Sequence, residues 1–224
     1  MPKKEYIQKM FAGISPHYDF LNRTLSLGRD IYWRRFAVAE LPHGLILDVC
    51  SGTGDVAIEA SSKRRVISSD FCREMTLLCS EKLKKLGIDN VFCVQNDSEN
   101  LSFNDDTFDG AIVAFGIRNV ADMEKALSEM YRVIKKDGKV IVLEFSRPEN
   151  RFFRGIYYYY FKKILPVIGT LISKKSGAYS YLPSSVMAFP ERRQFVEYMK
   201  RSGLKDIKYY DLTFGIVTIY AGIK

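Results

Sequence analysis

The chain of 224 residues is 47% hydrophobic and 27% charged, a composition typical of globular enzymes that excludes a disordered or fibrous protein. Its formal net charge of +8 leaves nucleic acid, anionic lipid and acidic ligands open as partners. The four cysteines form no C-x-x-C pair, and no run reaches the roughly 18 consecutive apolar residues of a membrane-spanning helix. We therefore expect a cytoplasmic protein without a metal site.

The first 43 residues are expected to form a cap over the rest of the chain. Residues 4–27 mix aromatic and polar side chains with glycine and proline, which predicts a short helix followed by a loop. From Asp30 to Leu41 the apolar residues have helical spacing, and Asp30 is the expected N-cap. Pro42 and Gly44 then end this helix.

The middle of the chain alternates between two kinds of periodic segment. Strands are predicted over residues 45–49, 66–70, 91–95, 109–115 and 139–145, and helices over residues 54–63, 73–86 and 122–135. The turn Lys136–Gly138 is expected to cap the last of these helices. Because each parallel crossover needs a helix, the pattern predicts a mostly parallel, doubly wound α/β sheet.

The alternation of predicted strands and helices ends after Pro148, and we expect a lid insertion over residues 148–189. The rest of the chain is predicted to hold, in order, a basic and aromatic segment at 151–175, a loop at 176–189, a helix at 190–202 and two hairpin strands at 207–212 and 216–223. This plan, one domain over residues 1–224, resembles class I S-adenosylmethionine-dependent methyltransferases. Their Rossmann-like sheet has seven strands, the last of which form an antiparallel hairpin.

A glycine-rich turn follows the first predicted strand. Gly52 and Gly54 let the backbone turn sharply and approach a ligand closely, and a helix begins directly afterwards. A strand, a glycine turn and a helix N-terminus are typical of nucleotide cradles, although the same pattern also occurs without a ligand. In a methyltransferase-like sheet, Asp48 would anchor this turn and, through water, the methionine part of the cofactor.

Acidic residues follow the next two strands. Asp70 can accept both hydroxyls of a ribose, as the acid about 20 residues downstream does in dinucleotide folds, or it can cap the following helix. Asp97 and Ser98 come after the third strand, where an acid can accept the exocyclic amine of adenine; a plain Asx turn is the alternative. A nucleoside cofactor satisfies all of these positions.

Motifs along nearly the whole chain resemble the ubiquinone/menaquinone biosynthesis C-methyltransferase family. They are Phe11, Tyr18–Asn22, Leu27–Gly28, Trp33–Arg35, Leu47–Asp55, Phe115–Val120, Met130–Val133, Leu143–Pro148, Tyr179–Leu182 and Gly215–Val217. The resemblance implies S-adenosyl-L-methionine as cofactor, with contacts at Thr53, Asp70, Asp97 and Ser98. Cys50 stands where the methyltransferase turn commonly has glycine, and Ala114 where relatives often have serine.

The resemblance also implies a reaction in which a prenylated quinol ring is methylated at carbon. Such a reaction needs electron push from a ring hydroxyl and an in-line methyl donor. Arg118 would stabilise the developing phenolate, while Asn119 and Tyr18 would orient the ring or a water. The alternatives are a surface ion pair for Arg118 and simple lid packing for Tyr18, and His17 is a minor candidate base.

The expected substrate is demethylmenaquinol, with 2-polyprenyl-6-methoxy-1,4-benzoquinol as the alternative. RNA methylation is disfavoured because no nucleic-acid module is visible, and a non-catalytic scaffold subunit of a quinone-synthesis complex remains a third hypothesis. The segment 151–175 is interpreted either as a solvated capping helix or as an amphipathic lid on the anionic inner face of a membrane. A homodimer is a further hypothesis.

Overall fold

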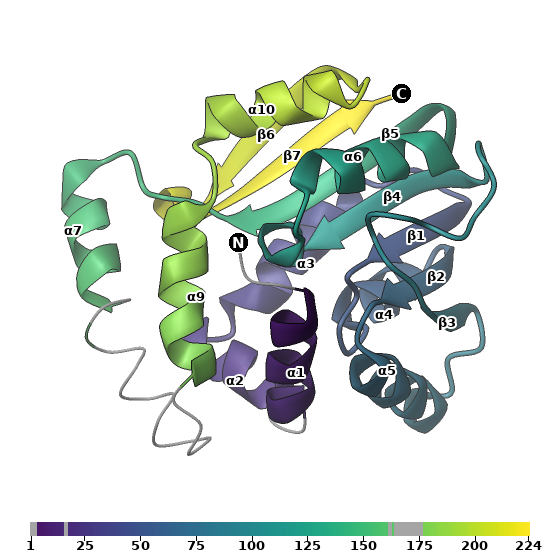
Figure 1. Ribbon diagram of the computed structural model, residues 1–224, viewed down its shortest axis with the longest axis horizontal. Coiled ribbons are helices and arrows are strands. Elements are labelled where there is room, and N and C mark those ends of the chain that lie inside the picture. The colour runs from purple at the N-terminus through teal and green to yellow at the C-terminus, as the bar shows by residue number, and fades with distance from the viewer. Residues whose placement is uncertain (1–3, 16–17, 161–162, 164–176) are drawn as a thin grey trace.

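A computed structural model describes residues 4–15, 18–160, 163 and 177–224 (Figure 1). Within these residues one sheet has the strand order β3-β2-β1-β4-β5-β7-β6. The strands are β1 (Leu45–Val49), β2 (Arg65–Asp70), β3 (Val91–Gln95), β4 (Phe108–Ala114), β5 (Ile134–Phe145), β6 (Lys205–Leu212) and β7 (Val217–Ile223). Strands β1 to β5 run parallel, while β7 runs antiparallel to β5 and β6. The predicted fold class is confirmed.

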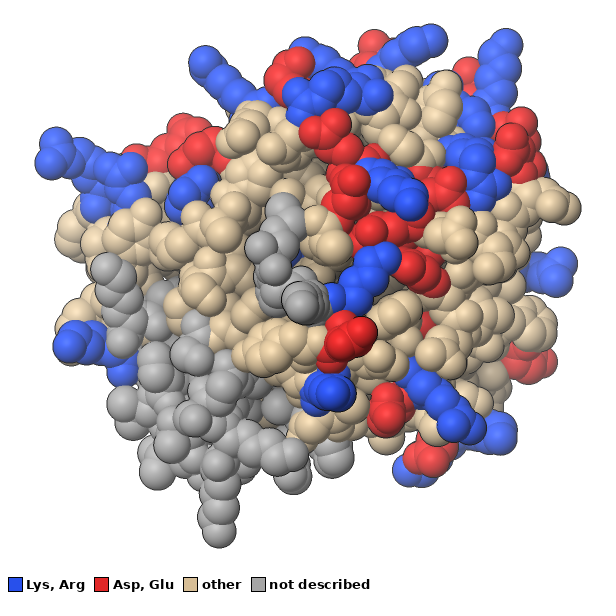
Figure 2. Space-filling model, viewed as in Figure 1, with Lys and Arg blue, Asp and Glu red and all other residues tan. Residues whose placement is uncertain are grey.

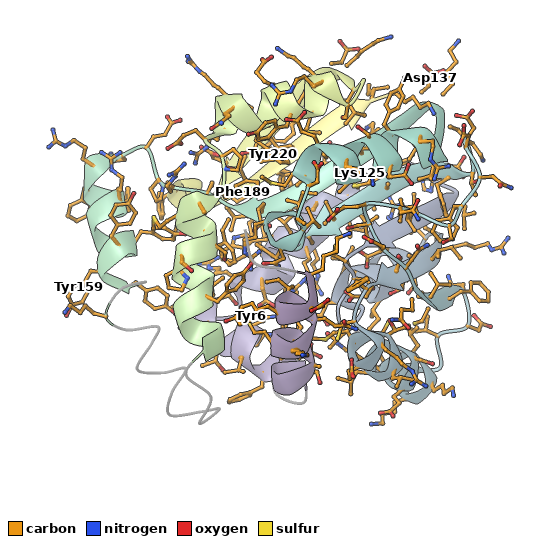
Figure 3. All side chains as sticks on the ribbon, viewed as in Figure 1. Tyr6, Lys125, Asp137, Tyr159, Phe189 and Tyr220 are labelled. Carbon is orange, nitrogen blue, oxygen red and sulfur yellow. The ribbon has the colours of Figure 1, made fainter. Side chains whose placement is uncertain are left out.

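Helices cover both faces of the sheet. One face packs against α3 (Arg29–Ala39), α4 (Asp55–Ser61) and α5 (Arg73–Leu86), and the other against α6 (Met123–Val133) and α10 (Arg192–Arg201). Along β5, Ile141 and Leu143 belong to the first core, whereas Val140 and Val142 belong to the second, as the two-residue period of a strand requires. Tyr220 lies beneath α10, with its ring centre 4.8 Å from that of Phe195 (Figure 3).

Four more helices gather beyond the carboxyl ends of β4 and β5 (Figure 1). They are α1 (Lys4–Ile14), α2 (Tyr18–Leu25), α7 (Arg151–Tyr159) and α9 (Gly177–Ala188). The single short helix predicted over 4–27 is thus two helices. The loop predicted at 176–189 is wrong, because α9 is helical through Pro183. No helix in the described part of the chain has both the length and the apolar character needed to cross a bilayer.

Two local predictions are also wrong. The N-cap of α3 is Gly28, with φ of 73°, because the buried carboxylate of Asp30 binds Ser26 and Arg34 instead of free helix N–H groups. The turn Lys136–Gly138 lies within β5, since α6 already ends at Val133 and Ile134 pairs with Phe108 of β4.

Candidate active site

Two cavities lie at the carboxyl ends of the parallel strands. The strand-end cavity, about 90 Å³, is lined by Gly52, Asp70, Asp97 and Ser98 among others. The aromatic cavity, about 380 Å³, is lined mainly by α2, α3, α7 and the start of the turn after β4. Tyr18 and Phe115 line both cavities. The two spaces therefore meet at these two rings.

Asp70 ties the glycine turn to the end of β2. Its two oxygens accept hydrogen bonds from the backbone N–H groups of Gly52 and Cys72, each at 2.8 Å. Burial raises the pKa of Asp70, and these two N–H donors offset part of that rise. The N-cap of α5 is Cys72, so Asp70 binds the backbone just before the helix instead of capping it. A carboxylate has further lone pairs available for ribose hydroxyls.

Asp97 makes a different set of contacts at the end of the β3 loop. Its Oδ1 accepts the N–H of Glu99 at 3.0 Å, which is the Asx turn considered from the sequence. Its Oδ2 lies 2.7 Å from Nζ of Lys4, which also lies 3.0 Å from Glu99. Partial burial by itself would raise the pKa of Asp97. Lys4 and the N–H of Glu99 together outweigh this effect, so the pKa of Asp97 is lowered.

Helix α1 covers the strand-end cavity with Lys4, Gln8 and Phe11. The volume of the strand-end cavity, about 90 Å³, is below the roughly 300–1,000 Å³ typical of small-molecule sites. The ion pairs from Lys4 to Asp97 and Glu99 hold α1 against this cavity.

Three residues predicted to contact the cofactor do not line the described cavities. Asp48 is 1% exposed, and neither oxygen accepts a well-formed hydrogen bond from a described residue, although the backbone N–H of Ala57 lies near it. Burial raises its pKa well above the usual range. The hydroxyl of Thr53 donates to Asp19 of α2. At Gly54, a Cβ would lie 2.3 Å from Sγ of Cys79, so this glycine allows α5 to pack closely.

The structure explains how the side chain of Cys50 is accommodated next to Gly116. Cys50 has φ of 54°, a conformation that favours glycine, and it lines the strand-end cavity. Its Cβ occupies the space next to Gly116, where an added Cβ would lie only 2.5 Å away. Burial raises the pKa of the Cys50 thiol, so it stays protonated. Cys50 and Gly116 therefore form a matched large and small pair.

The pair predicts a coupling that a double-mutant cycle measures. Gly116→Ala should destabilise the protein by about 1–3 kcal/mol through overpacking against Cys50, since φ of −108° at Gly116 suits alanine. Adding Cys50→Gly should recover most of that loss. Urea unfolding of the four variants gives the coupling energy, and additive effects would contradict the direct contact.

Arg118 lies in the 3₁₀ helix η2 (Ile117–Asn119) and lines the aromatic cavity. Its Nη1 is 2.7 Å from Oε1 of Glu144, a residue of β5 that is fully buried. The same nitrogen donates to the carbonyl of Phe115 at 2.5 Å. Nε of Arg118 is buried and has no hydrogen-bond partner among the described residues. The predicted alternative, an ion pair with a surface acid, is wrong because Glu144 lies inside the protein.

Asn119 lies on the strand-end side of the junction, and Tyr18 lies at the junction itself. Asn119 lines the strand-end cavity, and its Oδ1 accepts a hydrogen bond from the hydroxyl of Tyr181 of α9 at 3.0 Å. Burial raises the pKa of Tyr18, while nearby Asn22, Arg34 and Arg118 act in the opposite direction. Tyr18 is therefore a neutral hydroxyl at neutral pH. His17 lies outside the described residues.

The strand-end cavity suits a nucleoside cofactor that carries positive charge. Its lining contains the three carboxylates of Asp70, Asp97 and Glu99 against one cation, Lys4. Asp70 can accept vicinal hydroxyls, and Asp97 can accept an exocyclic amine, because a carboxylate has about four acceptor positions. The residues present therefore fit S-adenosyl-L-methionine.

Comparison with known proteins agrees with this geometry. The model of the ubiE/COQ5 methyltransferase family matches residues 1–224. The chain belongs to this family. It is 47% identical over 230 residues to the ubiquinone/menaquinone biosynthesis C-methyltransferase UbiE of Geotalea daltonii, covering 99% of this chain and 97% of the relative. It is 42% identical to the demethylmenaquinone methyltransferase of Deinococcus radiodurans, covering 99% and 94%.

Solved structures with little sequence identity share the methyltransferase's fold. An S-adenosylmethionine-dependent methyltransferase of Thermotoga maritima, described as a possible histamine N-methyltransferase, has a TM-score of 0.69 at 21% identity, covering 96% of this chain and 99% of that one. The [4+2]-cyclase SpnF has a TM-score of 0.73 at 13% identity, covering 100% and 97%.

The sequence interpretation missed two residues of this site. Glu144 gave a signal, because it is an acid inside an otherwise apolar strand, a position that is costly without a partner. Lys4 gave none, because its partners Asp97 and Glu99 are far away in the sequence.

Proposed function

We propose that this methyltransferase transfers the methyl group of S-adenosyl-L-methionine to a ring carbon of a prenylated quinol, with demethylmenaquinol as its principal substrate. The observation that carries the proposal is the meeting of the two cavities at Tyr18 and Phe115. One cavity has carboxylates for a cationic nucleoside, and the other is lined by aromatic and aliphatic side chains suited to a ring with an isoprenoid tail. The names of the relatives support a quinone substrate for those proteins.

The bound cofactor would supply an activated methyl group on a sulfonium, which needs no further activation. The side chains at the junction would then bind and orient the ring. Nε of Arg118 is a buried donor with no hydrogen-bond partner among the described residues, and it would stabilise negative charge on a ring oxygen as the hydroxyl loses its proton. Asn119, held by Tyr181, and Tyr18 would fix the ring between the cavities.

Label transfer tests the proposal directly. Protein incubated with methyl-labelled S-adenosyl-L-methionine and a short-tailed demethylnaphthoquinol should transfer label to the ring carbon, and more slowly to the corresponding benzoquinol. Faster transfer to the benzoquinol would favour the ubiquinone substrate. Cofactor binding without transfer to either quinol would favour the scaffold hypothesis.

We propose in addition that the exposed face of α7 rests on an anionic membrane surface. Phe152, Ile156 and Tyr159 follow helical spacing on one face and are 71%, 54% and 64% exposed. Tyr159 projects away from the rest of the molecule (Figure 3). Phe153 lies on a neighbouring face of the helix, and the centre of its ring is 4.3 Å from that of Phe214, on which it stacks. The surface over α7 is mostly uncharged in the view of Figure 2, with Lys and Arg and some acidic side chains at its edge.

Flotation with vesicles containing about 30% anionic lipid checks this surface. The double variant Phe152→Ser, Ile156→Ser should bind at least about 100-fold more weakly than the unchanged chain, because burying each large apolar side chain contributes about 1.5–3 kcal/mol. Leu77→Ser with Leu86→Ser on α5 is the matched control, since these leucines are 52% and 57% exposed. Equal loss in both double variants would contradict a specific α7 contact.

A further inference from the structure

One carboxylate among the described residues lines the aromatic cavity, that of Asp30 on α3. Asp30 is 3% exposed, although it lies in the first turn of a helix whose neighbouring residues Arg29 and Ile31 reach the surface. Its Oδ1 accepts the hydroxyl of Ser26 at 2.8 Å, and its Oδ2 binds Arg34. A buried acid on the wall of a substrate-sized cavity is placed for proton transfer.

Arg34 has a second acidic partner, and this lets Asp30 change its charge. Nη1 of Arg34 lies 3.4 Å from Oδ2 of Asp55, which itself binds Lys82 of α5. When Asp30 takes up a proton, Arg34 keeps Asp55 as counter-ion. No buried cation is then left unpaired, which removes the largest cost of protonating a carboxylate in an ion pair.

We propose that Asp30 is the base that accepts the proton of the ring hydroxyl during methyl transfer. The inference rests on the proposed function. The O–H bond of the quinol breaks and its proton goes to Asp30, while the oxygen electron pair moves into the ring. The ring carbon forms a bond to the methyl carbon as the sulfonium C–S bond breaks to a neutral thioether. The ring C–H proton then leaves to solvent, and the electron pair of that bond returns through the ring to the oxygen. Asp30 gives its proton back to this oxygen, so the methylated quinol forms and one proton is released overall.

The other charged and titratable groups around Asp30 are less suited to this role. Those that face it or share its cavity are Arg23, Arg34, Arg29, Tyr18, Arg118, Tyr157 and Tyr160. Arginines stay protonated, and burial raises the pKa of each of the tyrosines Tyr18, Tyr157 and Tyr160. Glu144 is held by Arg118 and does not line the cavity. Among the groups that the structure describes around this cavity, Asp30 is the remaining acceptor.

Asp30→Asn tests the proposal because it keeps the size of the side chain and removes the base. At neutral pH, turnover should fall about 100-fold or more. It should then rise about tenfold per pH unit under anaerobic conditions, as hydroxide replaces the base. Asp30→His should regain at least tenfold, with an acid limb near pH ~6.5. A chlorinated quinol with a more acidic hydroxyl should shrink the penalty of Asp30→Asn.

Glu59→Gln is the matched control, because it also removes a carboxylate that pairs with an arginine of α3, the exposed Arg35, yet lies outside the cavity. It should keep the turnover and the pH dependence of the unchanged chain. Thermal unfolding and cofactor titration verify that each variant is folded. The inference alone would be overturned if Asp30→Asn stayed within threefold of the unchanged chain, or if Glu59→Gln lost as much turnover and Asp30→Asn showed no new pH slope. An unchanged chain that transfers no label would instead overturn the proposed function.

Discussion

Arg118→Ala is expected to lose both turnover and stability. Removing a donor for developing oxyanion charge typically costs about 100- to 1,000-fold in turnover. Removing one partner of a buried ion pair costs roughly 3–5 kcal/mol, and Glu144 would remain fully buried without its partner. Cofactor affinity should change much less, because Arg118 does not line the strand-end cavity. Steady-state kinetics, urea unfolding and cofactor titration measure the three effects.

The pH dependence of unfolding identifies Glu144 as the source of the stability loss. Burial raises the pKa of Glu144, and Arg118 opposes that rise, so the pKa should climb further in Arg118→Ala. A buried acid with a raised pKa loses stability as pH rises through its folded pKa. The deficit of Arg118→Ala should therefore be smallest near pH 4 and grow toward neutral pH.

A second variant separates the structural role from the chemical one. Arg118→Met combined with Glu144→Leu replaces the pair with apolar side chains, which is often neutral for stability. We expect stability within about 2 kcal/mol of the unchanged chain but turnover as low as in Arg118→Ala. Recovery of turnover in the double variant would show that Arg118 acts only as a structural ion pair.

Asp70→Ala is expected to weaken cofactor binding by about 100-fold or more, with a smaller effect on the affinity for quinol. The change removes hydrogen bonds to charged groups, each worth roughly 1.5–3 kcal/mol, and frees the N–H groups of Gly52 and Cys72. Because the pKa of Asp70 is raised, cofactor affinity of the unchanged chain should begin to fall at a higher pH than an ordinary aspartate would give. Isothermal titration measures both effects.

Asp105→Ala is the matched control for Asp70→Ala, since it removes the same charge from an exposed loop where Asp105 pairs with Arg132. Its cofactor affinity should stay within about twofold of the unchanged chain, as expected for a screened surface pair. Equal affinity of Asp70→Ala and Asp105→Ala would exclude Asp70 from the cofactor site.

Elements with a strong local signal were predicted closely from the sequence. The strand at 91–95 and the helix at 73–86 match β3 and α5, because apolar period and the terminal Gly87 are local properties of the chain. Helix α9 was missed because its apolar residues lack a clear face and Pro183 stands inside it. The prediction of Asp30 as an N-cap is wrong because its carboxylate pairs with Arg34, one turn further along the same helix.

The gathering of Gly52, Asp70, Asp97 and Ser98 at one edge of the sheet followed from the sequence, because parallel strands all end at the same side of a sheet. Which side chains meet was decided by the tertiary structure alone. The hydroxyl of Thr53 donates a hydrogen bond to Asp19 of α2. Arg118, in η2 after β4, forms an ion pair with Glu144 of β5. Such contacts depend on strand register and on how the cap helices pack. Neither of these produces a periodic pattern in the amino-acid sequence.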